Sequence, residues 1–554
     1  MSSAPPAPTA RPARRLPLAD VLRLGRPSDI WFKPALSVVA AVAPPSLLLV
    51  ALDRLDLALY TMAGSLCALY AHNRPYAARA KVLAGVVLGM LAGLATALVA
   101  ASLTRNAVVL VTVGAVLAAA QKVLCDATRV GPPGNVVLTF VSSASLFVPQ
   151  TPGQVPGHLG LAAAAGLWAW LVGMAPALTR PHGPERRATA HALNAAAAYA
   201  ETAGTGDGHT GARATALAAV QAARQSLRSA GRRPSATRRA LARLVVRAEV
   251  ALAAPTDADP ARLRAWAGAL RGTGPVPDTG DPRADTAEPA AARRTPRAGL
   301  GALAALTPLA ARTAVGCALA GYASLALGIG RPYWALVTAA ALYQANLSLT
   351  WGRTVQRVVG NLAGVLLFAA VAPLAHLGPL ALVLCCLAFS FGAEALISRN
   401  YWLGSVCVTP LALLVTGFAG PQRTGDLVTE RAVDTLVGAA IGFAAALAVT
   451  DRRAGDRVVR SLTAVDRARE HAARVLADPG AAPAAVETAR RDLAAALLDL
   501  RATADAAAGE WWQRALPRER VVLAERSGHR TLAATVRRQG LLPDPGTDTE
   551  DVRP

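Results

Sequence analysis

Two long apolar blocks, at residues 33–178 and 308–450, limit what this chain can fold into. Each block is followed by a polar region rich in Arg and Ala. A helix crosses a bilayer with about 20 mostly apolar residues, and each block holds several such lengths. The chain has 554 residues, of which 53% are hydrophobic and 17% charged, so it has too little polar surface for a soluble protein of this size. The sequence therefore predicts an all-α polytopic membrane protein.

Each block can be divided into six apolar segments, which gives twelve predicted spans. They lie near residues 34–52, 57–72, 82–103, 106–125, 134–149 and 158–178, and near 308–329, 333–349, 355–375, 378–397, 402–420 and 431–450. Apolar positions at helical spacing predict helical domains in the two polar regions. The predicted domains are a disordered basic N-terminus (1–30), transmembrane block 1 (31–179), helical domain 1 (180–275), a flexible linker (276–307), transmembrane block 2 (308–450), and helical domain 2 with a disordered tail (451–554).

Positive charges are more frequent in the loops on one side of these spans. Those loops carry Arg74, Arg79, Lys81, Lys122, Arg129, Arg353, Arg357 and Arg399. Lys and Arg accumulate in cytoplasmic loops, so both termini and both polar regions are expected in the cytoplasm of a multi-pass plasma-membrane protein. The net charge of +22 comes with no basic patch interleaved with aromatic residues, which argues against a nucleic-acid partner.

The two blocks resemble each other in sequence. Tyr60 aligns with Tyr333, and the pair Leu69-Tyr70 aligns with Leu342-Tyr343. With a shift of two residues, Gly85 and Gly89 align with Gly360 and Gly364. An even number of spans inserts both copies the same way up, so the pattern predicts a parallel duplication with a pathway between the halves.

The stretch "YWALVTAAALYQANLSLTWGRTVQRVVGNLAGVLLF" holds the first group of candidate site residues. Its polar residues lie in a short predicted span, where they either line a substrate pathway or form hydrogen bonds between helices. Its arginines either anchor a helical hairpin at the cytoplasmic surface or bind a substrate carboxylate. The predicted pathway residues are Gln344, Asn346, Ser348, Arg353 and Arg357.

Glycines four residues apart predict close helix packing, because a small face lets two backbones approach. The predicted packing positions are Gly85, Gly89, Gly360 and Gly364.

Acidic residues within apolar segments are the second group of candidates, because intramembrane acids are costly and often functional. Glu394 and Asp126 are each followed by an arginine, so each is expected either in an ion pair or in proton coupling or gating. Asp434 either pairs with Arg431 or faces the pathway.

Several kinds of chemistry have no support in the sequence. The six cysteines lie in or beside apolar runs without a C-x-x-C pair, and the eight histidines form no ligand cluster, so no metal site and no cofactor is expected. None of the three lysines follows a glycine, which excludes a Gly-Lys phosphate-binding loop. Neither G-x-S-x-G nor H-E-x-x-H occurs, so the chain is not expected to be an enzyme of either type.

The second block resembles the fusaric acid resistance and aromatic acid exporter family of membrane transporters. The resemblance lies in an aromatic-Trp helix, an Arg-x-x-Gly-x-x-x-Gly bend, an Asn-Tyr segment and a Thr-Pro helix. These are Tyr333-Trp334, Arg357 with Gly360 and Gly364, Asn400-Tyr401, and Thr409-Pro410. The match is close over 311–450 and weaker in the first block. Asn361 stands where the family usually has a threonine, and the polar turn reads Ala-Asn-Leu-Ser rather than a Pro-Ser type.

The resemblance implies an inner-membrane transporter that exports small aromatic or amphipathic organic acids, driven by the proton-motive force. Two alternatives stay open, an organic-anion channel and a membrane scaffold that transports nothing. The expected partners are the lipid bilayer and the organic-acid substrate. A homo-oligomer and an envelope adaptor protein also stay open as partners.

Overall fold

The computed structural model describes residues 18, 20–25, 31–202, 208–230, 235–278, 306–419, 423–449, 454–511 and 517–539. Within these residues the chain forms helices and no strands, as predicted from the sequence. The expectations of disorder for the N-terminus, the linker and the C-terminal tail fall mostly outside the described residues.

Each predicted block forms six main helices. In block 1 they are α1 (Phe32–Ala51), α2 (Ala58–Ser65), α3 (Tyr76–Leu103), α4 (Ala107–Thr128), α5 (Val136–Ser145) and α6 (Val155–Met174), and the short α7 (Pro176–Thr179) follows. In block 2 they are α13 (Thr307–Ala326), α14 (Tyr333–Ala340), α15 (Leu347–Ala375), α16 (Pro379–Ile397), α17 (Tyr401–Thr416) and α18 (Thr424–Ala448).

The prediction of twelve spans needs correction. Among the described residues, eight helices are long and apolar enough to cross a membrane. The four predicted spans at 57–72, 134–149, 333–349 and 402–420 contain the shorter helices α2, α5, α14 and α17. These are the second and the fifth helix of each block, so both blocks are shortened at the same two places.

The end of α14 shows how such a short helix is accommodated. The helix stops at Ala340, and the chain runs without helical structure until α15 begins at Leu347. Leu342 and Tyr343 in this segment are nevertheless buried. Non-helical backbone at membrane depth is tolerated where protein surrounds it or where it lines a cavity, and transporters use such broken helices to build binding sites.

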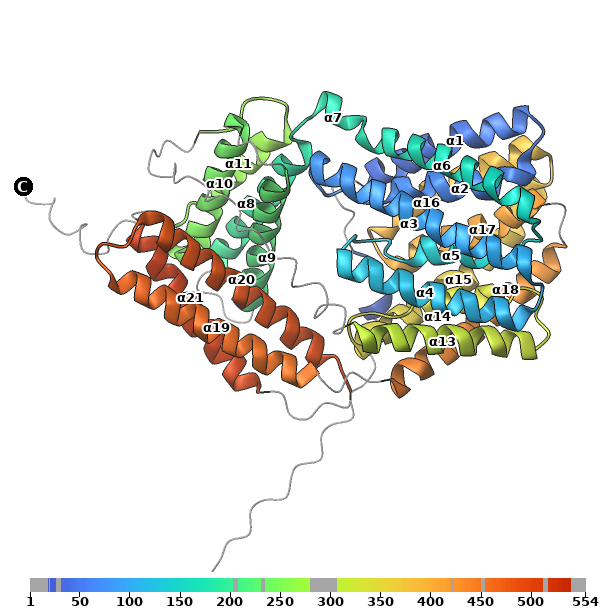
Figure 1. The fold of residues 1–554 in the computed structure, drawn as a ribbon. Coiled ribbons are helices and arrows are strands. Elements are labelled where there is room, and N and C mark those ends of the chain that lie inside the picture. The colour runs from blue at the N-terminus through green and yellow to red at the C-terminus, as the bar shows by residue number, and fades with distance from the viewer. Residues whose placement is uncertain are drawn as a thin grey trace, which may run out of the picture.

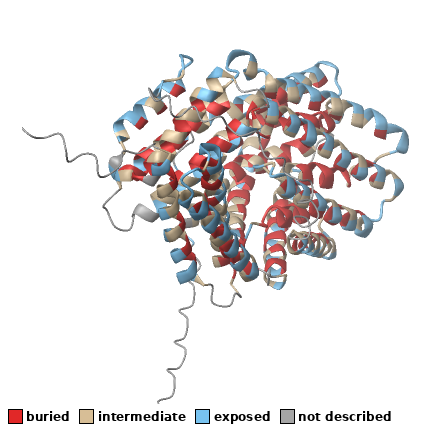
Figure 2. Ribbon diagram, turned by 60° about the vertical axis from the view of Figure 1, so that its left-hand side comes forward, coloured by how far each residue is buried: buried red, intermediate tan, exposed pale blue. Residues whose placement is uncertain are grey.

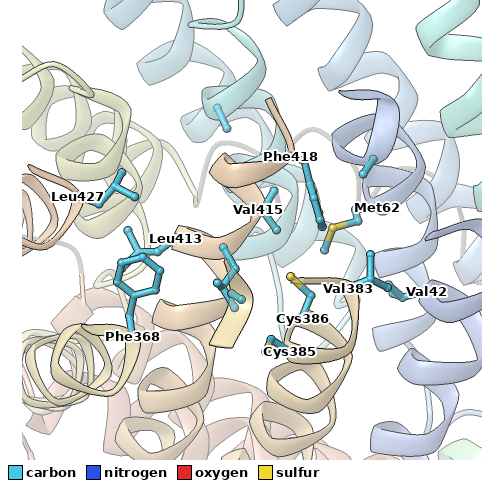
Figure 3. Close-up of a cluster of buried hydrophobic side chains, with 14 of the residues drawn as sticks. Val42, Met62, Phe368, Val383, Cys385, Cys386, Leu413, Val415, Phe418 and Leu427 are labelled. Carbon is cyan, nitrogen blue, oxygen red and sulfur yellow. The ribbon is translucent and has the colours of Figure 1, made fainter. Parts of the chain in front are cut away.

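The two blocks pack together reciprocally. The first helix of each block contacts the fourth helix of the other, so α1 packs against α16 and α13 against α4. An apolar cluster fills part of this junction, and Figure 3 shows Val42 and Met62 of block 1 gathered with Cys386 and Phe418 of block 2. Burial of this apolar surface joins the blocks into one bundle.

The outer surface of the bundle is apolar. Large side chains such as Leu88, Leu366 and Leu384 are more than half exposed, and exposed positions follow the outward faces of the helices (Figure 2). A contiguous apolar surface of this kind needs a non-aqueous surrounding, and the long apolar helices identify it as the lipid bilayer.

The polar regions fold into two helical domains beyond the same end of the bundle (Figure 1). Domain 1 contains α8 (Gly183–Glu201), α9 (Gly208–Ser229), α10 (Ala236–Ala253) and α11 (Pro260–Arg271). Domain 2 contains α19 (Ala454–Ala477), α20 (Pro483–Ala508) and α21 (Arg518–Arg538). Each domain has its own Ala- and Leu-rich core. The end of the bundle that faces these domains is called the domain end below.

Candidate functional site

A group of polar side chains lies inside block 2, where α13, α14, α15, α17 and α18 pack together. Arg357 lies on α15, ten residues after its start at the domain end, and is buried. Its Nη1 donates a hydrogen bond to the Tyr401 hydroxyl at 2.8 Å. The guanidinium of Arg353, one turn earlier, lies 3.8 Å from the centre of the Tyr401 ring in a cation–π contact. Tyr401 therefore holds both arginines at the start of α17.

A second buried arginine approaches from the opposite end of the bundle. Arg431 lies on α18, and its guanidinium is 5.0 Å from the centre of the buried Trp334 ring. Within the described part of the chain, its Nε and Nη1 have no hydrogen-bond acceptor, and the Nε of Arg357 has none either. A buried guanidinium donor without an acceptor costs free energy, so this arrangement needs a reason other than stability.

One carboxylate accompanies the two arginines. Asp434, one turn after Arg431, accepts a hydrogen bond from the Ser324 hydroxyl at 2.6 Å through Oδ1. Its other oxygen, Oδ2, has no donor among the described residues. Arg431 is close enough to Asp434 and to Arg357 for their charges to act on it. This group therefore carries two positive charges and one negative charge, with spare donors on both arginines.

Asn361 connects three helices beside these charges. Its side-chain oxygen accepts a hydrogen bond from Thr409 on α17 at 3.0 Å, and its side-chain nitrogen donates to Thr435 on α18 at 3.2 Å. Asn361 is one turn after Arg357, so this connection fixes α15, α17 and α18 around the arginines.

Of the predicted pathway residues, three lie at the start of α15 rather than beside the arginines. Asn346 accepts a hydrogen bond from the Leu349 backbone and so caps the helix. Gln344 precedes the cap, and its side chain donates to the Tyr343 carbonyl. The exposed Ser348 donates to the Gly509 carbonyl of domain 2 at 2.9 Å and lies 3.3 Å from the Trp511 indole nitrogen. These three residues therefore lie where domain 2 meets block 2.

The segment Gly509–Trp511 connects domain 2 to several helices of block 2. A Cβ on Gly509 would lie 2.2 Å from the Asn346 side chain, so any other residue there would displace that side chain. Glu510 is 4.0 Å from Arg312 on α13, and the Trp511 ring packs edge-on against Phe443 of α18. Domain 2 is thus fixed to the first turn of α15, the helix that carries Arg353 and Arg357.

The predicted acidic residues are separated in the structure. Asp126 forms an ion pair at 3.2 Å with Lys122, one turn earlier, rather than with Arg129. Glu394 is half-buried near the domain end of α16, and no hydrogen bond or ion pair joins it to Arg399 or to any other described residue. Asp434 alone lies in the arginine group.

The predicted packing glycines behave differently in the two blocks. A Cβ on Gly360 would lie 2.5 Å from the Trp402 carbonyl oxygen, and one on Gly364 would lie 2.7 Å from Thr409 Cβ. A Cβ on Gly85 or Gly89 would meet nothing within 4 Å. The predicted packing role is therefore corrected for Gly85 and Gly89, because no neighbouring helix lies against these two positions among the described residues.

A short N-terminal segment covers the turn between α16 and α17. The Gly25 amide donates to the Arg399 carbonyl, and the Asn400 side chain donates to the Val21 and Arg23 carbonyls at 3.0 and 2.8 Å. The Trp402 indole donates to the Leu22 carbonyl. The chain that precedes α1 thus reaches the domain end of block 2, one residue from Tyr401.

Block 1 has a buried polar group of another kind. Thr139 donates to the Gln121 oxygen at 2.9 Å, the Gln121 nitrogen donates to Ser142 at 2.9 Å, and Asn135 donates to Thr139 at 3.2 Å. All four side chains are neutral and buried. This network satisfies its own members and links α4 to α5.

Sequence reasoning missed Trp334 and Tyr401 as parts of the site and treated Arg431 only as a partner for Asp434. The available signal was an arginine and an aspartate one turn apart within an apolar helix, since intramembrane charges mark functional sites. The described residues contain no group of three His, Cys, Asp or Glu side chains that could hold a metal.

Comparison with known proteins gives one match. Residues 318–445 match the family model described as "Fusaric acid resistance protein-like". No curated protein and no solved structure matches the chain. The match covers α14 to α17, most of α18 and the last nine residues of α13, and so includes Arg357, Arg431 and Asp434. The resemblance seen in the sequence is thereby confirmed: the chain is a multi-pass membrane protein with a fusaric acid resistance protein-like domain at residues 318–445.

Proposed function

We propose that the protein exports small aromatic or amphipathic organic acids across the plasma membrane, driven by the proton-motive force. The observation that carries the proposal is the pair of buried arginines, Arg357 and Arg431, whose spare donors have no acceptor in the described chain. A carboxylate supplies the acceptors that both guanidiniums lack. Trp334 and Tyr401, which contact the two arginines, offer aromatic surfaces for the body of such a substrate.

The two blocks are proposed to be repeats that rock against each other. The reciprocal packing of α1 with α16 and of α13 with α4 supports this, as does the shortening of the second and fifth helix in each block. Broken helices at the centre of such repeats are common in secondary transporters. The helical domains face the cytoplasm in this proposal, because the domain end carries more Lys and Arg.

Glu394, Asp434 and Asp126 remain the proposed groups for proton coupling or gating. Asp434 has the best position, because it lies beside Arg431 and has one oxygen without a donor. Protonation of its carboxylate would leave the arginines with an excess of two positive charges and strengthen their hold on an anion. Release of the proton would weaken that hold.

Efflux from preloaded cells tests the proposal. Cells loaded with 4-hydroxybenzoate are compared with and without a protonophore, using wild type, Arg431→Met and Glu394→Gln. Arg423→Met is the matched control, because Arg423 is exposed at the start of the same helix. We expect export against a gradient by wild type and by the control, and loss of export in Arg431→Met and in uncoupled cells.

Other outcomes would favour the alternatives. Flux that only follows the concentration gradient would indicate an organic-anion channel. If Arg431→Met leaves the cellular phenotype intact and no acid leaves faster than from cells without the protein, a scaffold becomes the better reading. If the Glu394→Gln variant inserts correctly into the membrane but also loses export, proton coupling is assigned to α16 rather than to Asp434.

A further inference from the structure

A cavity lies between the two helical domains, away from the membrane. Its empty volume of about 550 Å³ includes space open to solvent, so it is a partly open pocket, bounded by α9 and α10 of domain 1 and by α20 and α21 of domain 2. Four arginines line it, namely Arg213, Arg224, Arg490 and Arg491. Much of the remaining wall is aliphatic and includes Leu217 and Leu532.

Ion pairs inside the cavity wall join the two domains. Arg224 of domain 1 pairs with Glu249 of the same domain and lies 3.4 Å from Glu487 of domain 2. Arg490 of domain 2 also pairs with Glu249, at 2.7 Å, and Arg491 pairs with Glu487 at 2.6 Å. Two carboxylates thus serve three guanidiniums.

Arg213 adds a fourth positive charge. Within the described part of the chain, no carboxylate lies within 4 Å of its guanidinium. Burial would raise the pKa of Glu487, but Arg490, Arg224 and Arg491 lower that pKa to about 2, so Glu487 is already neutralised by its partners. Burial, with a contribution from Arg213, lowers the pKa of His529 to about 3, so this wall residue is a neutral ring at physiological pH. Glu525 of α21 is near enough for its charge to act on Arg213, but it pairs with Arg501 at 3.5 Å. The four arginines of the wall thus outnumber the two carboxylates that pair with them, and the cavity has an excess of positive charge beside aliphatic and aromatic surface.

We propose that this cavity is a binding site for a small amphipathic organic anion, with its acidic group at Arg213 and Arg491 and its apolar body along Leu217 and Leu532. The wall comes from both domains, so an occupant bridges them. The choice of an aromatic carboxylate as ligand rests on the function proposed above. The inference that the ligand is an amphipathic anion rests only on the charge and the lining of the cavity.

A ligand here would act on the membrane block through α20. This helix carries Arg490 and Arg491 and ends at Ala508, directly before Gly509. The Gly509 carbonyl accepts hydrogen bonds from the backbone and the side chain of Ser348 at the start of α15. A ligand in the cavity is therefore linked through α20 to α15, the helix that carries Arg357. The site is an effector site, at which the anion concentration in the compartment of the helical domains sets transport.

Calorimetric titration of the full chain in nanodiscs tests the site, with 4-hydroxybenzoate as the probe. Arg431→Met removes the membrane site and keeps the cavity. Arg213→Ala removes the spare charge, and Ala494→Trp fills the cavity from its wall while keeping every charge. Arg460→Ala, an exposed arginine of α19, is the control. We expect binding to persist in Arg431→Met and Arg460→Ala, and to weaken by at least about 10-fold in Arg213→Ala and Ala494→Trp.

Three results would overturn the proposal. Binding by Arg213→Ala and Ala494→Trp at wild-type affinity would place the ligand elsewhere. Equal binding of the neutral 4-hydroxybenzamide would remove the role of the arginines. Equal binding of inorganic phosphate would remove the role of the apolar wall. Export from cells is measured separately. If the cells export no acid but binding still depends on Arg213, the proposed transport function is wrong and the cavity site is retained.

Discussion

Blocks 1 and 2 share a helical plan but differ in what they bury. Block 1 encloses a neutral network around Gln121 in which each side chain finds a partner. Block 2 encloses Arg357, Arg431 and Asp434 with donors and an acceptor left over. A satisfied neutral network stabilises one arrangement, whereas unpaired buried charge costs free energy until a ligand or a proton arrives. Block 1 also buries Arg79, whose Nε has no acceptor among the described residues and whose Nη2 lies 3.0 Å from His72 Nδ1. In block 2, by contrast, two buried arginines and a carboxylate lie together, which supports the proposal that block 2 is the binding half.

The sequence alignment makes this difference explicit. The offset that pairs Gly85 with Gly360 also pairs Val82 with Arg357, and Val86 with Asn361. Two polar positions of the site in block 2 are therefore valines in block 1. Exchanging them one at a time tests which of them carries the function.

The largest effect is expected from Arg357→Val, which gives α15 the residue of block 1. Loss of a buried charged partner costs about 2–5 kcal/mol of binding, so export should fall by about 100-fold or more. Thermal stability should be unchanged or higher, because a buried guanidinium with an unpaired donor is removed. Transport assays and thermal denaturation of the purified protein measure the two quantities.

Lys81→Met is the control for this exchange, because Lys81 is an exposed charge beside Val82 at the start of α3. It should keep export near wild type. If the Arg357→Val variant exports as well as the Lys81→Met variant, the assignment of function to block 2 is wrong.

The next effect concerns the paired glycines. Gly364→Ala places a methyl group 2.7 Å from Thr409 Cβ and 2.9 Å from the Val406 carbonyl oxygen. Overpacking of this kind costs about 1–3 kcal/mol, so the melting temperature should fall. Gly89→Ala at the aligned position meets nothing within 4 Å and should be neutral or stabilising by up to about 1 kcal/mol, from helix propensity. Equal destabilisation by both substitutions would mean that α3 has a partner on this face.

The glycines also show where sequence reasoning reaches its limit. The apolar blocks and the Ala-rich regions were enough to predict the helices, because spanning length and helical periodicity are local properties. Gly89 and Gly364 each lie four residues after another glycine, among mostly apolar residues, yet of the two only Gly364 faces another helix. Which face of a helix is covered depends on tertiary packing, and a spacing pattern does not contain that information.

The same limit applies to the site. Arg357 was predicted from its place in a polar bend, but Arg431 was considered only as a partner for Asp434. Only the fold shows that α15 and α18 enter from opposite ends and bring the two arginines together. The cavity between the helical domains was not predictable for a stronger reason, since its wall combines residues from 213 to 536.

A smaller effect is expected from Gln121→Leu in block 1. It removes the acceptor of Thr139 and the donor to Ser142 from a buried network. Unsatisfied buried groups cost about 1–3 kcal/mol, so the protein should melt at a lower temperature. Below that temperature, export should stay close to wild type, because the network contacts none of the charges of block 2. A selective loss of export at full stability would show that block 1 takes part in binding.

The smallest effect is expected from Asn361→Val, the second exchange toward block 1. Asn361 joins Thr409 and Thr435, but each threonine hydroxyl also donates to a carbonyl of its own helix, at 2.9 Å to Ser405 and 2.7 Å to Arg431. Both hydroxyls keep a partner after the exchange, so the cost in stability should be about 1 kcal/mol or less. Asn361→Thr, which restores the residue usual in the resembling family, should cost less still. A loss of export as large as that of Arg357→Val, with the protein stable, would instead mean that the Asn361 amide binds the substrate directly, and the binding half would then extend from the arginines to the contact between α15 and α17.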